Sequence, residues 1–109
     1  IVSVGYGAGP QIAERLERNN VIVNYQATPD EEGFTASGAL RMGVSEMTRF
    51  GFGKKEFEQL AAMMADCILR GREIGGDVAR LRAGHLEMGY CFNDAQFEDA
   101  LEKLIARTV

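Results

Sequence analysis

The chain has 109 residues, a net charge of −4, 46% hydrophobic and 26% charged residues, a composition typical of a globular domain. The acidic balance argues against nucleic-acid binding, because phosphate recognition usually needs a basic surface. No apolar run reaches the roughly 18–20 residues that span a membrane. The length predicts one domain over residues 1–109. Because Ile1 stands in strand-like sequence without an initiating methionine, we expect this domain to be excised from a longer chain.

Three short runs predict β-strands. Residues 1–6 (IVSVGY) are rich in β-branched side chains, and residues 21–25 (VIVNY) repeat that pattern. Residues 38–44 (GALRMGV) form a third run, although glycines weaken a strand. The segment 26–37 before it is polar and contains proline and glycine, which predicts a loop.

A helix is predicted between the first two strands. Pro10 suits its first turn, and residues 11–19 place apolar side chains on one face and charges on the other. Asn19 and Asn20 then offer a left-handed C-cap.

The second half of the chain has the periodicity of helices. A short helix is predicted at residues 45–50, a long amphipathic helix ending near Gly71, and another helix over residues 77–83. The segment 84–92 has no clear period. The predicted inner face of the long helix consists of Phe57, Leu60, Ala61, Met64 and Ile68.

A last helix is predicted to start at Asn93, because Gln96 three residues later completes a pair that resembles a capping box. Its predicted inner face consists of Phe97, Leu101, Leu104 and Ile105. The order β-α-β-β followed by helices predicts an α+β fold. We expect a small three-stranded, largely antiparallel sheet covered on one face by helices, with extra C-terminal helices.

Cys67 and Cys91 do not have the spacing of metal ligands. One stands in a helical run and the other in an aromatic segment, which predicts two buried thiols in a reducing cytoplasm. A disulfide between them is the alternative.

Two motifs suggest chemistry but have a simpler structural interpretation. Glycines in residues 5–9 lie between a strand and a helix, as in a phosphate-binding turn. Pro10 occupies the third glycine position of the dinucleotide fingerprint, which favours a tight turn instead. His85 is the only histidine. No nucleophile or acid stands in a recognised relation to it, which favours a surface or helix-end role over general base catalysis.

Other polar and sulfur-containing clusters are interpreted structurally as well. The acidic residues 30–32 and the pair Lys54–Lys55 are expected to be solvated, and the pair Met63–Met64 is expected to pack in the core and at its flank.

Arg41 is the candidate binding residue, because it stands in a strand-like run between Gly38 and Gly43. A guanidinium can grip a carboxylate through two parallel hydrogen bonds, and flanking glycines let a ligand or another backbone come close. The pattern leaves two interpretations open: an anion-binding arginine, and an outward-facing arginine on an edge strand.

The stretch from Asn19 to Phe52 resembles the C-terminal small domain of serine (glycine) hydroxymethyltransferases, which are pyridoxal-phosphate enzymes of the aspartate-aminotransferase fold type. The family pattern is a strand ending V-N, followed by F-x-T-S-G-I-R-x-G-T-P-x-x-T-R-x-G. The residues that fall on it in order are Val23-Asn24, Phe34, Ser37-Gly38, Arg41, Gly43, Thr48-Arg49 and Gly51. The resemblance covers roughly residues 10–70, and the final forty or so residues match nothing in that pattern.

The resemblance implies a cytoplasmic transferase of one-carbon and amino-acid metabolism in which Arg41 binds the α-carboxylate of the amino-acid substrate. It also implies that a large domain of the same chain binds pyridoxal phosphate and that the full-length protein is a homodimer. We therefore expect no catalytic, cofactor-binding or metal-binding residue in this chain, and no activity from the chain alone.

The chain departs from the family pattern at three places. One extra residue lies between Gly38 and Arg41, Val44-Ser45 replaces T-P, and residues 32–34 (EGF) replace the S-P-F of the loop that contacts folate. The use of tetrahydrofolate and the identity of the amino acid therefore stay open. Two other hypotheses stay open too: a free-standing amino-acid-binding or regulatory module without catalysis, and a structural domain with Arg41 exposed.

Overall fold

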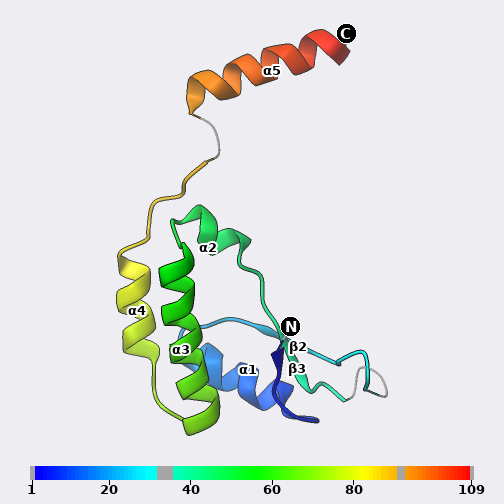
Figure 1. Ribbon diagram of the computed structural model, residues 1–109, viewed down its shortest axis with the longest axis vertical. Coiled ribbons are helices and arrows are strands. Elements are labelled where there is room, and N and C mark those ends of the chain that lie inside the picture. Colours follow the sequence, from blue (N-terminus) through cyan, green and yellow to red (C-terminus); the bar gives the residue numbers. More distant parts are fainter. Residues whose placement is uncertain (1, 32–35, 91–92, 109) are drawn as a thin grey trace.

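The computed structural model describes residues 2–31, 36–90 and 93–108 (Figure 1). In these ranges it contains three short strands and five helices. Their order along the chain is β1 (Val2–Ser3), α1 (Gly9–Arg18), β2 (Asn24–Gln26), β3 (Ala39–Arg41), α2 (Ser45–Arg49), α3 (Lys54–Arg70), α4 (Gly75–Ala83) and α5 (Asp94–Thr108).

The strands form an antiparallel sheet in the order β1-β3-β2, so β3 is the central strand. This confirms the predicted α+β class, although each strand is shorter than its apolar run. The run 21–25 shows why. Val21 donates its N–H to the carbonyl of Leu16 at 2.9 Å and packs in the core, so these residues first close the end of α1. Strand pairing begins only at Asn24.

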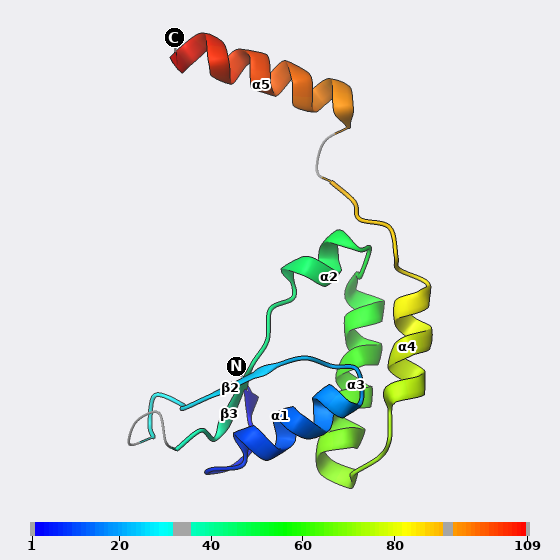
Figure 2. The ribbon, with the colours of Figure 1, turned by 180° about the vertical axis from the view of Figure 1, so that it is seen from behind.

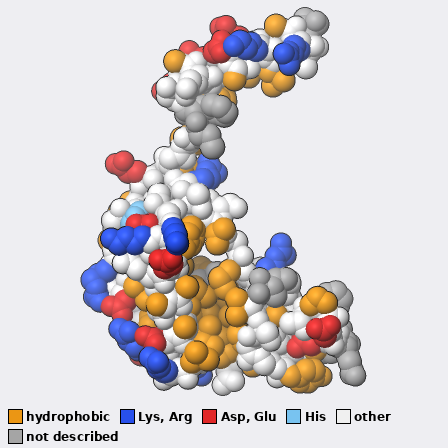
Figure 3. All heavy atoms as spheres, viewed as in Figure 1, with side chains coloured by type: hydrophobic (Ala, Val, Ile, Leu, Met, Phe, Trp, Pro, Cys, Tyr) orange, Lys and Arg blue, Asp and Glu red, His pale blue; other side chains and the backbone are white. Residues whose placement is uncertain are grey.

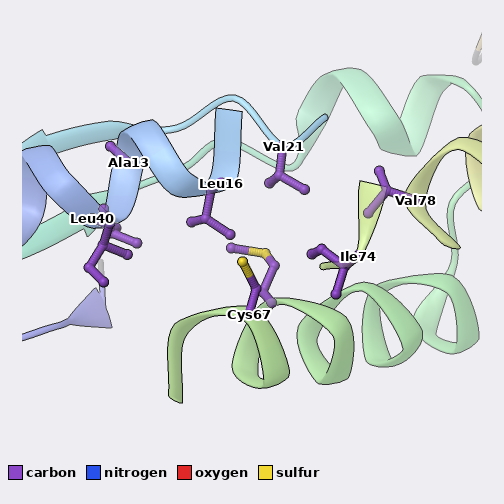
Figure 4. Packing of buried hydrophobic residues seen from close by; sticks show 9 residues of the cluster. Ala13, Leu16, Val21, Leu40, Cys67, Ile74 and Val78 are labelled. Atoms are coloured by element: carbon purple, nitrogen blue, oxygen red, sulfur yellow. The ribbon is translucent and has the colours of Figure 1, made fainter. Parts of the chain in front are cut away.

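The hydrophobic core lies where α1 packs between the sheet and α3, and α4 lies beside α3 with its start against the end of α1 (Figures 1 and 4). Leu16 of α1 and Leu40 of β3 are fully buried, and Leu16 points toward Cys67 of α3. The remaining buried members of the cluster are Ile12, Ala13, Val21, Met64, Ile74 and Val78.

Cys67 is a free, buried thiol, as predicted. Burial raises its pKa above the ordinary value of 9.0, so the side chain packs as a neutral, small apolar group. Cys91, the other predicted thiol, lies outside the described residues.

Asn19 is a polar residue within this core, with 2% of its surface exposed. Its Oδ1 accepts hydrogen bonds from the N–H groups of Ile74 at 2.7 Å and Gly75 at 2.9 Å, and its Nδ2 donates to the carbonyl of Arg15 at 3.0 Å. The prediction of a left-handed cap is correct for Asn20, whose φ is 67°, and wrong for Asn19, whose φ is −102°. Asn19, at the end of α1, instead accepts the backbone N–H groups at the start of α4.

The predicted helices of the second half are present. α3 ends at Gly71, as predicted, and Gly71 adopts the left-handed conformation. α3 begins at Lys54, and the Glu56 side chain accepts the N–H of Gly53 at 2.9 Å, which satisfies one amide at the start of this helix. The predicted inner face of α3 is wrong at Ala61, which is exposed; Cys67 takes the buried position. Met64 lies in the core and Met63 at its edge, as predicted.

α5 stands apart from the other elements (Figures 1 and 2). Its predicted cap is confirmed, since Asn93 Oδ1 accepts the Gln96 N–H at 2.8 Å and Gln96 Oε1 accepts the Asn93 N–H at 3.1 Å. Its predicted inner face is wrong in this structure, because all four side chains are exposed. The radius of gyration is 18.7 Å, whereas a compact domain of this length has about 13 Å.

Among the described residues, none of the helices combines the length and the apolar character that crossing a membrane requires.

Candidate functional site

Arg41 is the last residue of the central strand. Ala39 and Leu40 before it are fully buried, whereas Arg41 is exposed. Side chains alternate along a strand, and Leu40 faces the core with α1 and α3. Arg41 therefore leaves the sheet on the face opposite these helices. The expectation of an edge strand is wrong, because β3 is paired on both sides, with Asn24 of β2 opposite Arg41.

The guanidinium of Arg41 makes no ion pair or hydrogen bond within the described part of the chain. The other arginines often do: Arg70, Arg72 and Arg80 all pair with aspartates at the α3–α4 junction. Arg41 thus combines a fixed backbone with an unneutralised cation, which is what binding of an external carboxylate requires.

The segment 36–38 that leads into β3 is held by the turn before α1. Val4 N–H donates to the Gly38 carbonyl at 2.8 Å, Gly7 N–H to that of Ala36 at 2.7 Å, and Gly9 N–H to that of Ser37 at 2.8 Å. These bonds immobilise the backbone on the N-terminal side of Arg41.

The same bonds settle the role of the glycines in residues 5–9. Gly5 and Gly7 have φ values of 107° and 69°, as a tight β-to-α turn requires. The N–H groups of Gly7, Ala8 and Gly9 all bind carbonyls of this chain. The predicted tight turn is confirmed, and these amides are not available to a phosphate.

The two glycines that flank Arg41 differ in their surroundings. A Cβ on Gly38 would lie 3.0 Å from the Gly5 carbonyl oxygen and close to the Glu31 carboxylate. The space beside Gly38 is therefore already occupied by the Gly5 backbone and the Glu31 side chain. A Cβ on Gly43 would meet no described atom within 4 Å. The space beside Arg41 that a ligand could use is therefore on the Gly43 side.

Glu31 was expected to be solvated, and this is wrong. Its carboxylate accepts hydrogen bonds from the N–H groups of Thr28 and Gly38, the latter at 3.3 Å, and thereby ties the loop to the start of β3. The local sequence carries no signal for this contact, since neither donor lies at a helix end. Asp30 is exposed as predicted, and Glu32 lies outside the described residues.

His85 has the predicted helix-end role. Its Nδ1 lies 3.0 Å from the Leu81 carbonyl at the end of α4, and its ring packs edge-on against Phe52 with centroids 5.0 Å apart. Its Nε2 is 3.9 Å from Glu56 Oε1, so the end of α4 meets the start of α3.

The segment after α4 also contacts α2. The Arg49 guanidinium lies over the Tyr90 ring at 5.5 Å, and the Gly89 N–H donates to the Arg49 carbonyl at 2.5 Å. Arg82 lies over the Phe50 ring at 4.3 Å. Residues 82–90 therefore brace α2, the element that directly follows the Arg41 strand.

The cap at Glu56 leads to a prediction for acid stability. The hydrogen bond from the Gly53 N–H, the Glu56 N–H and nearby His85 together hold the pKa of Glu56 below its ordinary value of 4.5. A carboxylate with a lowered pKa in the folded state stabilises the fold above its unfolded pKa, and this contribution disappears as the pH falls through the folded value. We expect the free energy of unfolding of Glu56→Gln to fall less than that of the unmodified chain as the pH drops below about 4.5. Urea unfolding at several pH values measures this difference.

Glu58→Gln is the matched control, because Glu58 lies on the same helix and makes only an exposed pair with Lys54 at 3.8 Å. If Glu56→Gln and the unmodified chain lost stability equally between pH 5 and pH 3 (roughly the carboxylate range), the cap would carry no pH dependence.

The lysines of the chain lie on helix surfaces. Lys54 and Lys103 form exposed ion pairs with Glu58 and Asp99, and Lys55 is exposed. In the described ranges, no three His, Cys, Asp or Glu side chains are grouped so that they could hold a metal ion.

The chain is similar to several serine hydroxymethyltransferases. That of Pyrobaculum arsenaticum is 37% identical over 105 residues, which cover 93% of this chain and 24% of that enzyme. That of Pyrobaculum neutrophilum is 41% identical over 90 residues, covering 80% and 21%, and that of Thermoplasma acidophilum is 33% identical over 91 residues, covering 79% and 21%. This confirms the resemblance found in the sequence. The chain spans less than a quarter of the length of these relatives.

The similarity reaches further than the predicted residues 10–70. A match over 93% of the chain leaves about eight of its 109 residues unmatched, so it extends through α4 and into α5. The expectation that the tail matches nothing is therefore wrong. No family model matches the chain, and no solved structure matches it.

Proposed function

We propose that this chain is the C-terminal small domain of a serine hydroxymethyltransferase-like, pyridoxal-phosphate-dependent transferase, and that its Arg41 binds the α-carboxylate of the amino-acid substrate. The observation that carries the proposal is the state of Arg41: an exposed cation without a described partner, on a central strand whose entry is held by three backbone hydrogen bonds. The similarity to serine hydroxymethyltransferases over 80–93% of the chain supports the assignment of the domain.

The part that Arg41 plays in this proposal is binding and orientation. Two parallel hydrogen bonds from a planar guanidinium fix the angle of a carboxylate as well as its position. Holding the amino acid at one angle before it reacts lowers the entropic part of the barrier. A lysine ammonium at the same place would supply the positive charge but would not fix the angle of the carboxylate.

We assign pyridoxal phosphate and the catalytic lysine to a large domain on the same polypeptide, and the homodimer interface mainly to that domain. The exposure of the three lysines of this chain, two of which are ion-paired, supports this assignment of the catalytic lysine. The buried, free Cys67 supports a reducing, cytoplasmic location. Tetrahydrofolate stays open as the second substrate, because residues 32–34 lie outside the described ranges.

We expect Arg41→Lys in the full-length protein to weaken glycine binding by about 10- to 100-fold, which corresponds to the roughly 1.5–3 kcal/mol of a charged hydrogen bond. Isothermal titration with glycine measures this. The pyridoxal-phosphate content should be unchanged, since Arg41 does not hold the cofactor.

Arg18→Lys is the control, because Arg18 is an exposed arginine at the end of α1. Unchanged glycine affinity in Arg41→Lys would remove the binding role. Glycine binding by this chain alone, without the large domain, would favour the free-standing binding module instead.

A further inference from the structure

α5 carries an apolar face that nothing in the described chain covers. The side chains of Phe97, Leu101, Leu104 and Ile105 lie on one side of the helix and are 57%, 42%, 60% and 52% exposed. Hydrophobic atoms are visible on the surface of this helix in Figure 3. The opposite side carries Asp99, Glu102 and Lys103, so the helix has the two-faced pattern of an element that packs on one side.

A helix of this kind requires a partner to be stable. α5 has 15 residues, and an isolated helix of that length is marginal in water. Its own side-chain contacts are the Asn93–Gln96 cap, the Lys103–Asp99 ion pair at 2.7 Å and the hydrogen bonds of the Thr108 hydroxyl to the carbonyls of Leu104 and Ile105. An exposed pair of this type contributes about 0.3–0.5 kcal/mol. The remaining stability must come from burial of the apolar face.

The contacts before α5 limit where this partner can be. Gly89 and Tyr90 are held against Arg49 at the end of α2, and α5 starts at Asp94. Four Cα–Cα steps separate Tyr90 from Asp94, so these two residues lie at most about 14 Å apart. α5 therefore begins at the end of the molecule that carries α2, away from α1 and the start of α4 (Figures 1 and 2).

A second copy of α5 is a poor partner by area. Four half-exposed side chains can bury only on the order of a few hundred Å², below the roughly 800 Å² per partner of a stable complex. A domain on the same polypeptide avoids most of the association cost that two free molecules incur. The similarity to an enzyme about four times as long extends into α5. Part of this helix therefore has a counterpart in that longer enzyme.

We propose that the apolar face of α5 docks onto the large domain of the same polypeptide and fastens the small domain to it. This inference rests on the proposed function, because it requires the large domain to be present. The docking places a point of attachment at the end of the small domain that carries α2, the helix that follows the Arg41 strand.

Hydrogen–deuterium exchange of the full-length holoenzyme tests the docking. We expect the α5 amides to exchange at least 100-fold more slowly in the full-length protein than in this chain alone. Leu101→Glu should abolish that protection in the full-length protein. Ala106→Glu is the matched control, because it introduces the same charge on the opposite side of the helix and should preserve the protection.

Each other outcome overturns the docking. Equal protection in this chain alone would mean that α5 folds back on its own domain, and protection that disappears on dilution would mean that a second copy covers it. Rapid exchange of α5 in the full-length protein would mean that nothing covers it. The comparison of the two unmodified proteins decides the question even if Leu101→Glu does not fold.

Glycine titration of the same samples separates this proposal from the assignment of Arg41. Arg41-dependent glycine binding together with an unprotected α5 would overturn the docking alone. A protected α5 together with glycine binding that ignores Arg41→Lys would overturn the carboxylate assignment alone.

Discussion

Replacing Asn19 with alanine is expected to lower the free energy of unfolding by about 2–4 kcal/mol. The amide Oδ1 accepts the N–H groups of Ile74 and Gly75, and Ile74 is fully buried. Alanine removes this acceptor, so the N–H of the buried Ile74 loses its partner within the chain. The loss is large against the roughly 5–15 kcal/mol total stability of a domain. Urea unfolding monitored by circular dichroism measures it.

Asn20→Gly is the control for this substitution. Asn20 is exposed, has a left-handed φ of 67° that glycine adopts readily, and makes one exposed hydrogen bond to the Gly75 carbonyl at 3.1 Å. We expect a loss below about 1 kcal/mol. If both substitutions had the same small effect, the Asn19 amide would not be the link between α1 and α4.

Gly9→Ala is expected to destabilise the chain by about 1–3 kcal/mol, the usual cost of overpacking. Helix propensity alone predicts the opposite sign, since alanine is favoured over glycine in a helix by roughly 1 kcal/mol. A Cβ on Gly9, however, would lie far inside the contact distance of the Ser37 carbonyl oxygen and 2.9 Å from the Tyr25 Cβ. The backbone of segment 36–38 would have to move, and with it the entry to the Arg41 strand. Thermal and urea unfolding report the sign directly.

Gly43→Ala is the matched control, because a Cβ there meets no described atom within 4 Å and the φ of Gly43 is not positive. It should leave stability unchanged or raise it by up to about 1 kcal/mol through the unfolded state. A stabilising Gly9→Ala would contradict the close packing of α1 on segment 36–38.

Local patterns in the sequence were sufficient to predict most of the helices. The cap at Asn93, the end of α3 near Gly71 and the turn glycines before α1 were all predicted because each depends on residues within four positions of one another. The Arg41 motif was also recognisable from its order of residues alone. The bounds of the strands were not, since Val21 contributes to the end of α1 and the core rather than to strand pairing.

The sequence by itself determined the helix periods, the tight turn, the α+β order and the resemblance that singles out Arg41. Only the tertiary structure decided that β3 is central, that Asn19 caps a helix 55 residues away and that Glu31 holds the start of the Arg41 strand. It also decided that the apolar face of α5 lies uncovered. The physical reason is range: periodicity and caps are set by neighbours in the chain, whereas a buried polar contact or a covered face depends on which distant segments meet.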